Sequence, residues 1–302
     1  MKTVLVTGGN GFIGRHVVSR LEVGGYKVWV LDNRDRVTGS YRNIILGDVR
    51  DAVAVTEAVA HADGVIHLAG VLGTQETLTN PRPAAETNVI GGLNVLEACA
   101  QYKLPLVNIA VGNFWMNNTY SISKDTVSRF GDMFRRFRGT RVTNVRAFNA
   151  YGPGQDMVAP WGSSKVRKVL PNFINRALDG DPIEVYGDGK QVMDMIYVED
   201  LAHILVAALE ETAAGGVFSE AVEAGTGRET TVNEIASLVA QEVAHQTGNP
   251  PVGIVHLPMR PGEDESAVVV GDPDTLKGLI EHDLEPLENG LQKTVAYYKS
   301  LR

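Results

Sequence analysis

The chain has 302 residues, enough for one large domain or two of ordinary size, and 44% hydrophobic with 21% charged residues is typical of a globular protein. Its net charge of −8 argues against nucleic acid as the main partner, because binding a phosphate backbone requires a clustered positive surface. The single cysteine, Cys99, excludes an internal disulfide, and no Cys/His spacing suggests a metal site. The apolar N-terminal run is too short for a signal peptide or membrane span. We therefore expect a cytoplasmic protein that binds no membrane.

Short apolar strands and amphipathic helices alternate along the first half of the chain. This alternation predicts an α/β fold of the Rossmann type, a doubly wound parallel sheet with right-handed crossovers. Strands are predicted at 4–6, 26–31, 44–46, 64–68, 106–110 and 141–146, and helices at 12–24, 51–60, from 83 to about 99, and 120–138.

The regular alternation of strands and helices ends after residue 154. Residues 1–160 are predicted to form the Rossmann domain, to whose sheet a later segment adds a strand. Residues 161–302 are predicted to be mainly a smaller C-terminal lobe that closes over a ligand. Its expected elements are helices near 165–179, 199–211 and 231–245 and strands at 183–186 and 253–256.

The strongest motif is the glycine-rich turn between the first strand and the first helix. Gly8 permits a tight turn, Gly11 lets the backbone approach a pyrophosphate, and Gly14 lets the helix pack against the sheet. Phe12 and Ile13 begin the helix, whose unpaired N–H groups would face the phosphate. This turn predicts a dinucleotide site.

Two carboxylates follow the next strands. Asp32 ends the second strand, where it would accept hydrogen bonds from both ribose hydroxyls and repel a 2′-phosphate, which favours NAD over NADP. Arg34 could favour that phosphate, but we interpret it as a solvated surface charge. Asp48, before Val49, either binds the adenine amino group or caps a helix ahead of Asp51.

The chain resembles the extended short-chain dehydrogenase/reductase family, in its nucleotide-sugar epimerase/dehydratase branch, over almost its whole length. The resemblance implies NAD as cofactor and a nucleotide-linked sugar as substrate. Asn33, Val49, Leu68, Ala69 and Gly70 would then line the cofactor groove. The matching segments are 7–14, 32–33, 47–49, 67–70, 88–91, 120–124, 146–153, 185–189 and 260–262.

Tyr120 and Lys124 form the expected chemical centre, four residues apart on one face of a predicted helix. A nearby ammonium favours the phenolate and so predicts a lowered tyrosine pKa, which would let Tyr120 act as a base near neutral pH. The resemblance implies that Lys124 holds the nicotinamide ribose and that Asn88 lies behind the pair. It also implies that Asn149 touches the substrate and that Arg260 pairs with the nucleotide diphosphate. Packing or surface roles stay open for Asn88 and Arg260.

The chain departs from the family after its fifth strand. Relatives usually carry Ser or Thr there, bonded to the reacting oxygen, but residues 110–112 are Ala, Val and Gly. Asn113 is nearest in alignment, and its amide can donate a hydrogen bond. The remaining candidates for this donor, all of which could merely line loops, are Thr74, Thr77, Thr119 and Ser123.

A second departure concerns the diphosphate. Met193 stands where relatives usually have Arg, so the grip on the diphosphate would rest on Arg260 together with Lys165, Arg167 or Lys168. A solvated helix face is the alternative for these last three.

The leading hypothesis is an NAD-dependent epimerase that oxidises a nucleotide-linked sugar to a keto-sugar and returns the hydride to the opposite face. A dehydratase, reductase or decarboxylase on the same fold is the alternative, although 112–115 lacks the carboxylates typical of dehydratases. A non-catalytic NAD-binding sensor is a further alternative.

The resemblance also implies a homodimer joined by a four-helix bundle from helices 84–102 and 120–138. The second helix carries a wide apolar stripe, half or more of which could instead be core. The stripe comprises Phe130, Met133, Phe134 and Phe137.

Overall fold

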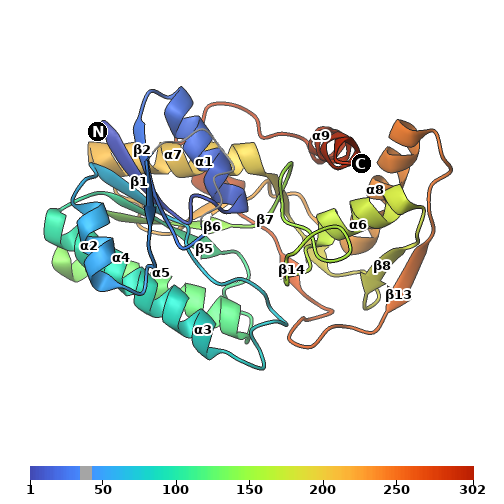
Figure 1. Ribbon diagram of the computed structural model, residues 1–302, viewed down its shortest axis with the longest axis horizontal. Helices are drawn as coiled ribbons and strands as arrows, with labels where there is room; N and C mark the ends of the chain where they lie inside the picture. The colour runs from blue at the N-terminus through green and yellow to red at the C-terminus, as the bar shows by residue number, and fades with distance from the viewer. Residues whose placement is uncertain (35–42) are drawn as a thin grey trace.

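The computed structural model describes residues 1–34 and 43–302. A seven-stranded parallel sheet in the order β11-β6-β5-β4-β1-β2-β3 forms its centre (Figure 1). The Rossmann-type prediction is thereby confirmed, and β11 is the expected strand from a later segment. The strands are β1 (Thr3–Thr7), β2 (Lys27–Asp32), β3 (Ile44–Leu46), β4 (Gly64–His67), β5 (Leu106–Val111), β6 (Val142–Ala147) and β11 (Val222–Ala224).

The strand order reverses between β1 and β4. The chain runs outward through β2 and β3 on one side and through β5 and β6 on the other. In open α/β sheets, ligands bind at such a reversal, outside the carboxyl ends of the strands. The last residues of the two strands, Thr7 and His67, are register partners there.

Helices cover both faces of the sheet (Figure 1). α1 (Phe12–Val23) and α7 (Val198–Ala214) share a core with one face, and α2 (Ala52–Val59), α4 (Gly91–Tyr102) and α5 (Thr119–Arg138) share a core with the other. The single helix predicted after residue 83 is instead α3 (Arg82–Ala85), a π-helical turn η1 (Glu86–Ile90) and α4.

The C-terminal lobe has its own core, built on α6 (Val169–Asp179), α8 (Val232–Thr247) and α9 (Leu287–Ser300). α6 begins later than predicted because Lys168 is extended, with φ −99° and ψ 140°. The sequence pattern did not predict α9.

No helix in residues 1–34 and 43–302 is long and apolar enough to cross a membrane. The remaining elements are β7 (Asn149–Tyr151), β8 (Ile183–Tyr186), β9 (Val192–Met193), β10 (Met195–Tyr197), β12 (Thr230–Thr231), β13 (Ile254–Leu257), β14 (Val268–Val269) and the 3-10 turn η2 (Pro273–Leu276).

Candidate active site

The glycine-rich turn lies at the reversal of the sheet and has no room for side chains. Gly8 has φ +71°, and a Cβ there would lie 2.8 Å from Ala69 Cα. A Cβ on Gly14 would lie 2.3 Å from the Gly8 carbonyl oxygen, so only glycine lets α1 approach the turn. Gly11 precedes Phe12 at the start of α1 and supplies no side-chain cap, which leaves the N–H groups of the helix end for an anion.

Asp32 is buried beside this turn, with 5% of its surface exposed. Its carboxylate accepts hydrogen bonds from the backbone N–H groups of Asn10 and Arg34, each at 3.0 Å. The Arg34 side chain, which we expected to be a solvated charge, lies with Nε 3.6 Å from Asp32 Oδ1. Arg34 thus partly neutralises the carboxylate that would face a ribose, while Asn33 is exposed next to it.

Asp48 is paired with Arg50 rather than placed at a helix end. Arg50 donates to it through Nε at 3.0 Å and Nη2 at 2.7 Å, and these bonds lower the Asp48 carboxyl pKa. Asp51 is the residue that caps α2, accepting from Val53 N and Ala54 N. The capping alternative for Asp48 is therefore wrong, and Val49 beside it is buried.

The segment after β4 forms a wall beside the glycine turn. Asn88, in the π-helical turn η1, accepts from Val71 N at 2.8 Å and donates to Val71 O at 3.1 Å. A Cβ on Gly70 would lie 2.9 Å from Asn88 Oδ1, so glycine is needed for this approach. Leu68 and Ala69 are half-buried against the turn.

Asn88 also fixes the helix that carries the predicted chemical centre. Its Nδ2 donates to the Ser123 hydroxyl at 2.9 Å, and that hydroxyl donates to the Tyr120 carbonyl at 3.0 Å. One amide thus ties η1, the loop after β4 and the first turns of α5 together. A π-helical turn often marks a functional site.

Tyr120 and Lys124 lie one turn apart near the start of α5, as the sequence predicts. Burial raises the pKa of the Tyr120 phenol to about 12 and lowers the pKa of the Lys124 ammonium to about 8. The lowered tyrosine pKa that we expected is therefore wrong for the protein alone. Burial disfavours the charged form of both groups, and this effect exceeds the influence of the ammonium on the phenol.

Lys124 is only 5% exposed, and its ammonium has no acceptor within residues 1–34 and 43–302. A charge on a largely buried side chain without a partner is costly, so a ligand that supplies acceptors would be favoured there. The carboxylate of Asp32 at the end of β2, the open backbone at Gly11 after β1 and this ammonium, near His67 at the end of β4, lie in that order along the carboxyl edge of the sheet. The residues present therefore fit a dinucleotide.

His67 is a functional candidate that sequence reasoning missed. It ends β4 with 2% of its surface exposed, and its Nδ1 lies 2.7 Å from Thr7 Oγ1. Burial, together with the charge of Lys124, lowers the pKa of this imidazole to about 3. The motif at 67–70 marks the segment, but nothing in its spacing indicates that the histidine side chain meets Thr7 and Lys124.

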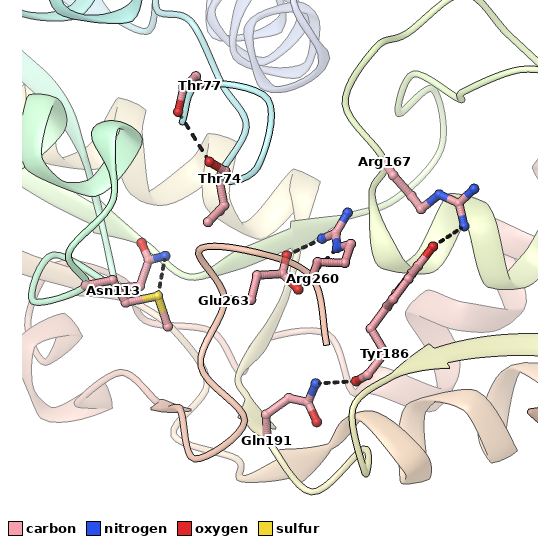
Figure 2. A network of polar contacts seen from close by, with 9 residues as sticks. Thr74, Thr77, Asn113, Arg167, Tyr186, Gln191, Arg260 and Glu263 are labelled. Carbon is pink, nitrogen blue, oxygen red and sulfur yellow. Dashed lines mark hydrogen bonds and ion pairs between the residues drawn. The ribbon is translucent and has the colours of Figure 1, made fainter. Parts of the chain in front are cut away.

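The five candidates for the donor that replaces the usual Ser or Thr hydroxyl differ in whether they already donate a hydrogen bond within the chain. Thr77 donates to Gly73 O at 2.7 Å, Thr119 to Thr77 O at 3.1 Å, and Ser123 to Tyr120 O. Asn113 donates to Met116 Sδ at 3.3 Å, which is a weak acceptor (Figure 2). The Thr74 hydroxyl has no partner in the described part of the chain. Asn113 and Thr74 are thus the donors most readily available to a substrate.

Arg260 already has a partner within the chain. Its guanidinium forms two hydrogen bonds with Glu263 and lies 5.1 Å from the centre of the Tyr186 ring (Figure 2). Arg167 donates to the Tyr186 hydroxyl at 2.9 Å and to Glu184 at 3.0 Å. Two arginines therefore contact one tyrosine, each balanced by a carboxylate.

Two other predicted substrate residues are placed differently. Asn149 in β7 donates through Nδ2 to Asp194 O at 3.1 Å, so its amide ties β7 to the segment before β10. Lys165 is exposed and forms no ion pair among the described residues. Lys168 is half-buried, and burial and the charge of Arg260 lower its ammonium pKa, while Glu76 opposes this. Lys168, not Lys165, is therefore the lysine that lies near Arg260 and Glu76.

Comparison with known proteins identifies the family of the chain. Residues 4–113 and 108–221 match the profile of the "NAD dependent epimerase/dehydratase family". The UDP-N-acetyl-alpha-D-glucosaminuronate decarboxylase of Bacillus cytotoxicus is 29% identical, over 99% of this chain and 98% of its own.

Solved structures share the fold over the same extent. The UDP-glucose 4-epimerase of Thermus thermophilus, in complex with NAD, superposes with a TM-score of 0.85 at 28% identity, over 99% of this chain and 100% of its own. The UDP-glucose 4-epimerase of Thermotoga maritima, with UDP-glucose, gives a TM-score of 0.86 at 28% identity with the same coverage. The chain described here belongs to the NAD-dependent epimerase/dehydratase family.

Proposed function

We propose that the protein is an NAD-dependent epimerase of a nucleotide-linked sugar. The observation that carries the proposal is the pair Tyr120 and Lys124, one turn apart at the carboxyl edge of the sheet, with the lysine buried and without an acceptor in residues 1–34 and 43–302. A phenol and an ammonium held in this way suit proton transfer at a sugar hydroxyl while the sugar carbon changes its oxidation state.

In this mechanism Tyr120 accepts the proton of one sugar hydroxyl and later gives it back. Bound NAD supplies a reversible hydride acceptor, and the positive charge of its oxidised ring opposes the effect of burial on the phenol pKa. Lys124 holds a ribose and stabilises the phenolate. The keto-sugar would rotate within the site, so that the hydride returns to its opposite face. Asn113 or Thr74 donates a hydrogen bond to the reacting oxygen.

The region around Arg260 and Lys168 would hold the nucleotide diphosphate. Arg260 and Lys168 provide its charge, and Asn149 offers its carbonyl oxygen to the sugar. Arg260 must then leave Glu263, at least in part, when the phosphate arrives. No carboxylate occurs in 112–119, so the elimination of water would lack a base in this loop.

A decarboxylase is the second candidate, and the full-length similarity to the Bacillus cytotoxicus enzyme favours it. Oxidation of a sugar carbon that is β to a carboxylate gives a β-keto acid, which loses carbon dioxide without a further base. The absence of a carboxylate from 112–119 therefore does not weigh against decarboxylation.

Incubation with UDP-, GDP- and dTDP-linked sugars, both neutral and uronic, with NMR of the products, tests the proposal. We expect a neutral sugar to yield its epimer without consuming added NAD. Loss of the carboxyl carbon from a uronic substrate would identify the decarboxylase instead. A Tyr120→Phe variant that leaves every measured property unchanged would favour a non-catalytic NAD sensor.

We also propose a cytoplasmic homodimer joined through α4 and α5. The α5 stripe is divided between core and surface: Phe134 is 2% exposed, whereas Met133 is 36% and Phe137 72% exposed. Ile122, one turn after the start of the same helix, is 51% exposed. Exposed apolar side chains along one helix support a helix–helix interface. The single, buried cysteine suits a reducing compartment.

A further inference from the structure

A hydrogen bond between side chains crosses the sheet where its strand order reverses. Thr7 is the last residue of β1, His67 is the last residue of β4, and the two are register partners on neighbouring strands. Both side chains are buried, and Thr7 Oγ1 lies 2.7 Å from His67 Nδ1. The pair therefore sits beneath the place where a dinucleotide crosses the sheet.

The bonds of the threonine hydroxyl fix the tautomer of the histidine. Thr7 Oγ1 accepts from Leu68 N at 3.2 Å and from Ala69 N at 3.3 Å. A hydroxyl has two acceptor lone pairs and one proton, and a backbone N–H can only donate. Leu68 N shares its proton with the Thr7 carbonyl oxygen at 3.1 Å, and the hydroxyl proton has no acceptor other than His67 Nδ1 in the described residues, so we assign it to that nitrogen. The neutral imidazole then carries its own proton on Nε2.

This Nε2–H has no acceptor in the described residues, and it belongs to a side chain with only 2% of its surface exposed. The Lys124 ammonium is a second such donor, close enough that its charge disfavours protonation of His67. Polar groups in largely buried side chains normally have hydrogen-bond partners, and a hydrogen bond is stronger in a site that holds little water. Two fixed donors on one side of the sheet reversal call for a ligand rich in acceptors.

We propose that His67 is a cofactor-binding residue whose Nε2–H donates to a hydroxyl of the ribose on the nicotinamide side of NAD. Asp32 ends β2, on one side of β1, and would bind the adenosine half of NAD. His67 ends β4, on the other side of β1, and lies near Lys124. Thr7 is then a positioning residue that holds the imidazole in its donating tautomer. This inference depends on NAD binding and not on which sugar reaction follows.

Side-chain ¹⁵N NMR of the wild-type protein tests the tautomer directly. The chain has 7 histidines, and sequential backbone assignment of the wild-type protein identifies the ring signals of His67 without any variant. We expect a neutral imidazole protonated at Nε2 at pH 7, whose Nε2–H signal shifts when NAD is added but stays unchanged with ADP. A proton on Nδ1, or no response to NAD, would overturn the proposal even if no variant folds.

Binding measurements by calorimetry separate a contact from a structural role. ADP occupies only the adenosine half of the site, so His67→Phe should weaken NAD about fivefold, the effect of one neutral hydrogen bond, and leave ADP unchanged. Thr7→Ser keeps the hydroxyl and should retain the NAD affinity, whereas Thr7→Val should lose about as much as His67→Phe. Equal losses for NAD and ADP, or no loss for NAD, would contradict the assignment.

Discussion

Arg260 donates from Nε to Glu263 Oε2 at 3.2 Å, and its Nη2 bonds the other carboxylate oxygen. Both residues belong to one turn, and the arginine side chain is 16% exposed. The planar fork of the guanidinium is therefore occupied by a carboxylate of the same chain. A diphosphate that used Arg260 would have to compete with Glu263.

The first prediction follows from this competition. Glu263→Gln removes the competing charge while keeping the shape of the side chain, so UDP should bind about threefold more tightly, as expected for one partly exposed ion pair. Calorimetry with UDP measures the change. Weaker binding would mean that Glu263 orients Arg260 for the phosphate, and the competition would then be refuted.

The second prediction compares two lysines three residues apart. Lys168 is half-buried near Arg260 and Glu76, and Lys165 is exposed. Lys168→Met should weaken UDP at least about tenfold, because it removes a charge-assisted contact, whereas Lys165→Met should leave the affinity unchanged. The same calorimetric titration serves for both. Equal effects of the two changes would remove Lys168 from the diphosphate site.

The two lysines illustrate what could be predicted from sequence. The alternation of strands and helices is a short-range pattern, and it predicted the sheet strands through β6 closely. The glycine turn, Asp32 and Tyr120 with Lys124 were likewise predicted because fixed spacing encodes their geometry. Which of Lys165 and Lys168 lies near Arg260 depends on the extended backbone before α6, which no spacing rule fixes.

Other features could not be predicted from the sequence because they depend on tertiary structure. The raised Tyr120 pKa reflects desolvation, which a helical spacing cannot report. The contact between Thr7 and His67 joins residues far apart in the chain through strand pairing. The π-helical turn at Glu86–Ile90 is a local departure within a segment that has ordinary helical spacing.

The third prediction concerns stability and pH. The Lys124 pKa falls from 10.5 to about 8 on folding, so between pH 8 and 10.5 the unfolded chain binds more protons. Stability should therefore rise with pH across that window, and the buried charge costs about 3 kcal/mol below it. Lys124→Met should be more stable at pH 7 and lack this rise. Tyr120, with its pKa raised to about 12, lowers stability only above pH 10.

Urea unfolding at pH 7, 8, 9 and 10 measures this effect, and the difference between wild type and Lys124→Met isolates the lysine. The variant should also bind NAD more weakly, since it loses the contact with the ribose. A parallel pH dependence in both proteins would contradict the buried charge at position 124.

The fourth prediction concerns the donor to the reacting oxygen. Removal of one such donor typically lowers kcat about 100-fold or more. We therefore expect Asn113→Ala or Thr74→Val to lower kcat by about this factor and to change KM less. Steady-state kinetics on the substrate found by NMR measures both constants. Thr119→Val, whose hydroxyl is already bonded to Thr77 O, serves as the control. If neither Asn113 nor Thr74 matters, polarisation comes from elsewhere.

The fifth prediction concerns the α5 surface. Phe137→Glu places a charge at a side chain that is 72% exposed and should dissociate the dimer at micromolar concentration. Val23→Glu, at an 87% exposed apolar residue of α1, should leave the assembly unchanged. Sedimentation velocity distinguishes the two. A wild-type protein that sediments as a monomer would refute the interface.

The most direct test of the central claim uses a nucleotide-linked sugar deuterated at the carbon that is inverted. If Tyr120 moves the hydroxyl proton and NAD carries the hydride, the epimer formed in ordinary water should keep the deuterium at that carbon, and Tyr120→Phe should form almost none. Loss of deuterium to the solvent during inversion would contradict the account, because the carbon would then have exchanged a proton rather than a hydride.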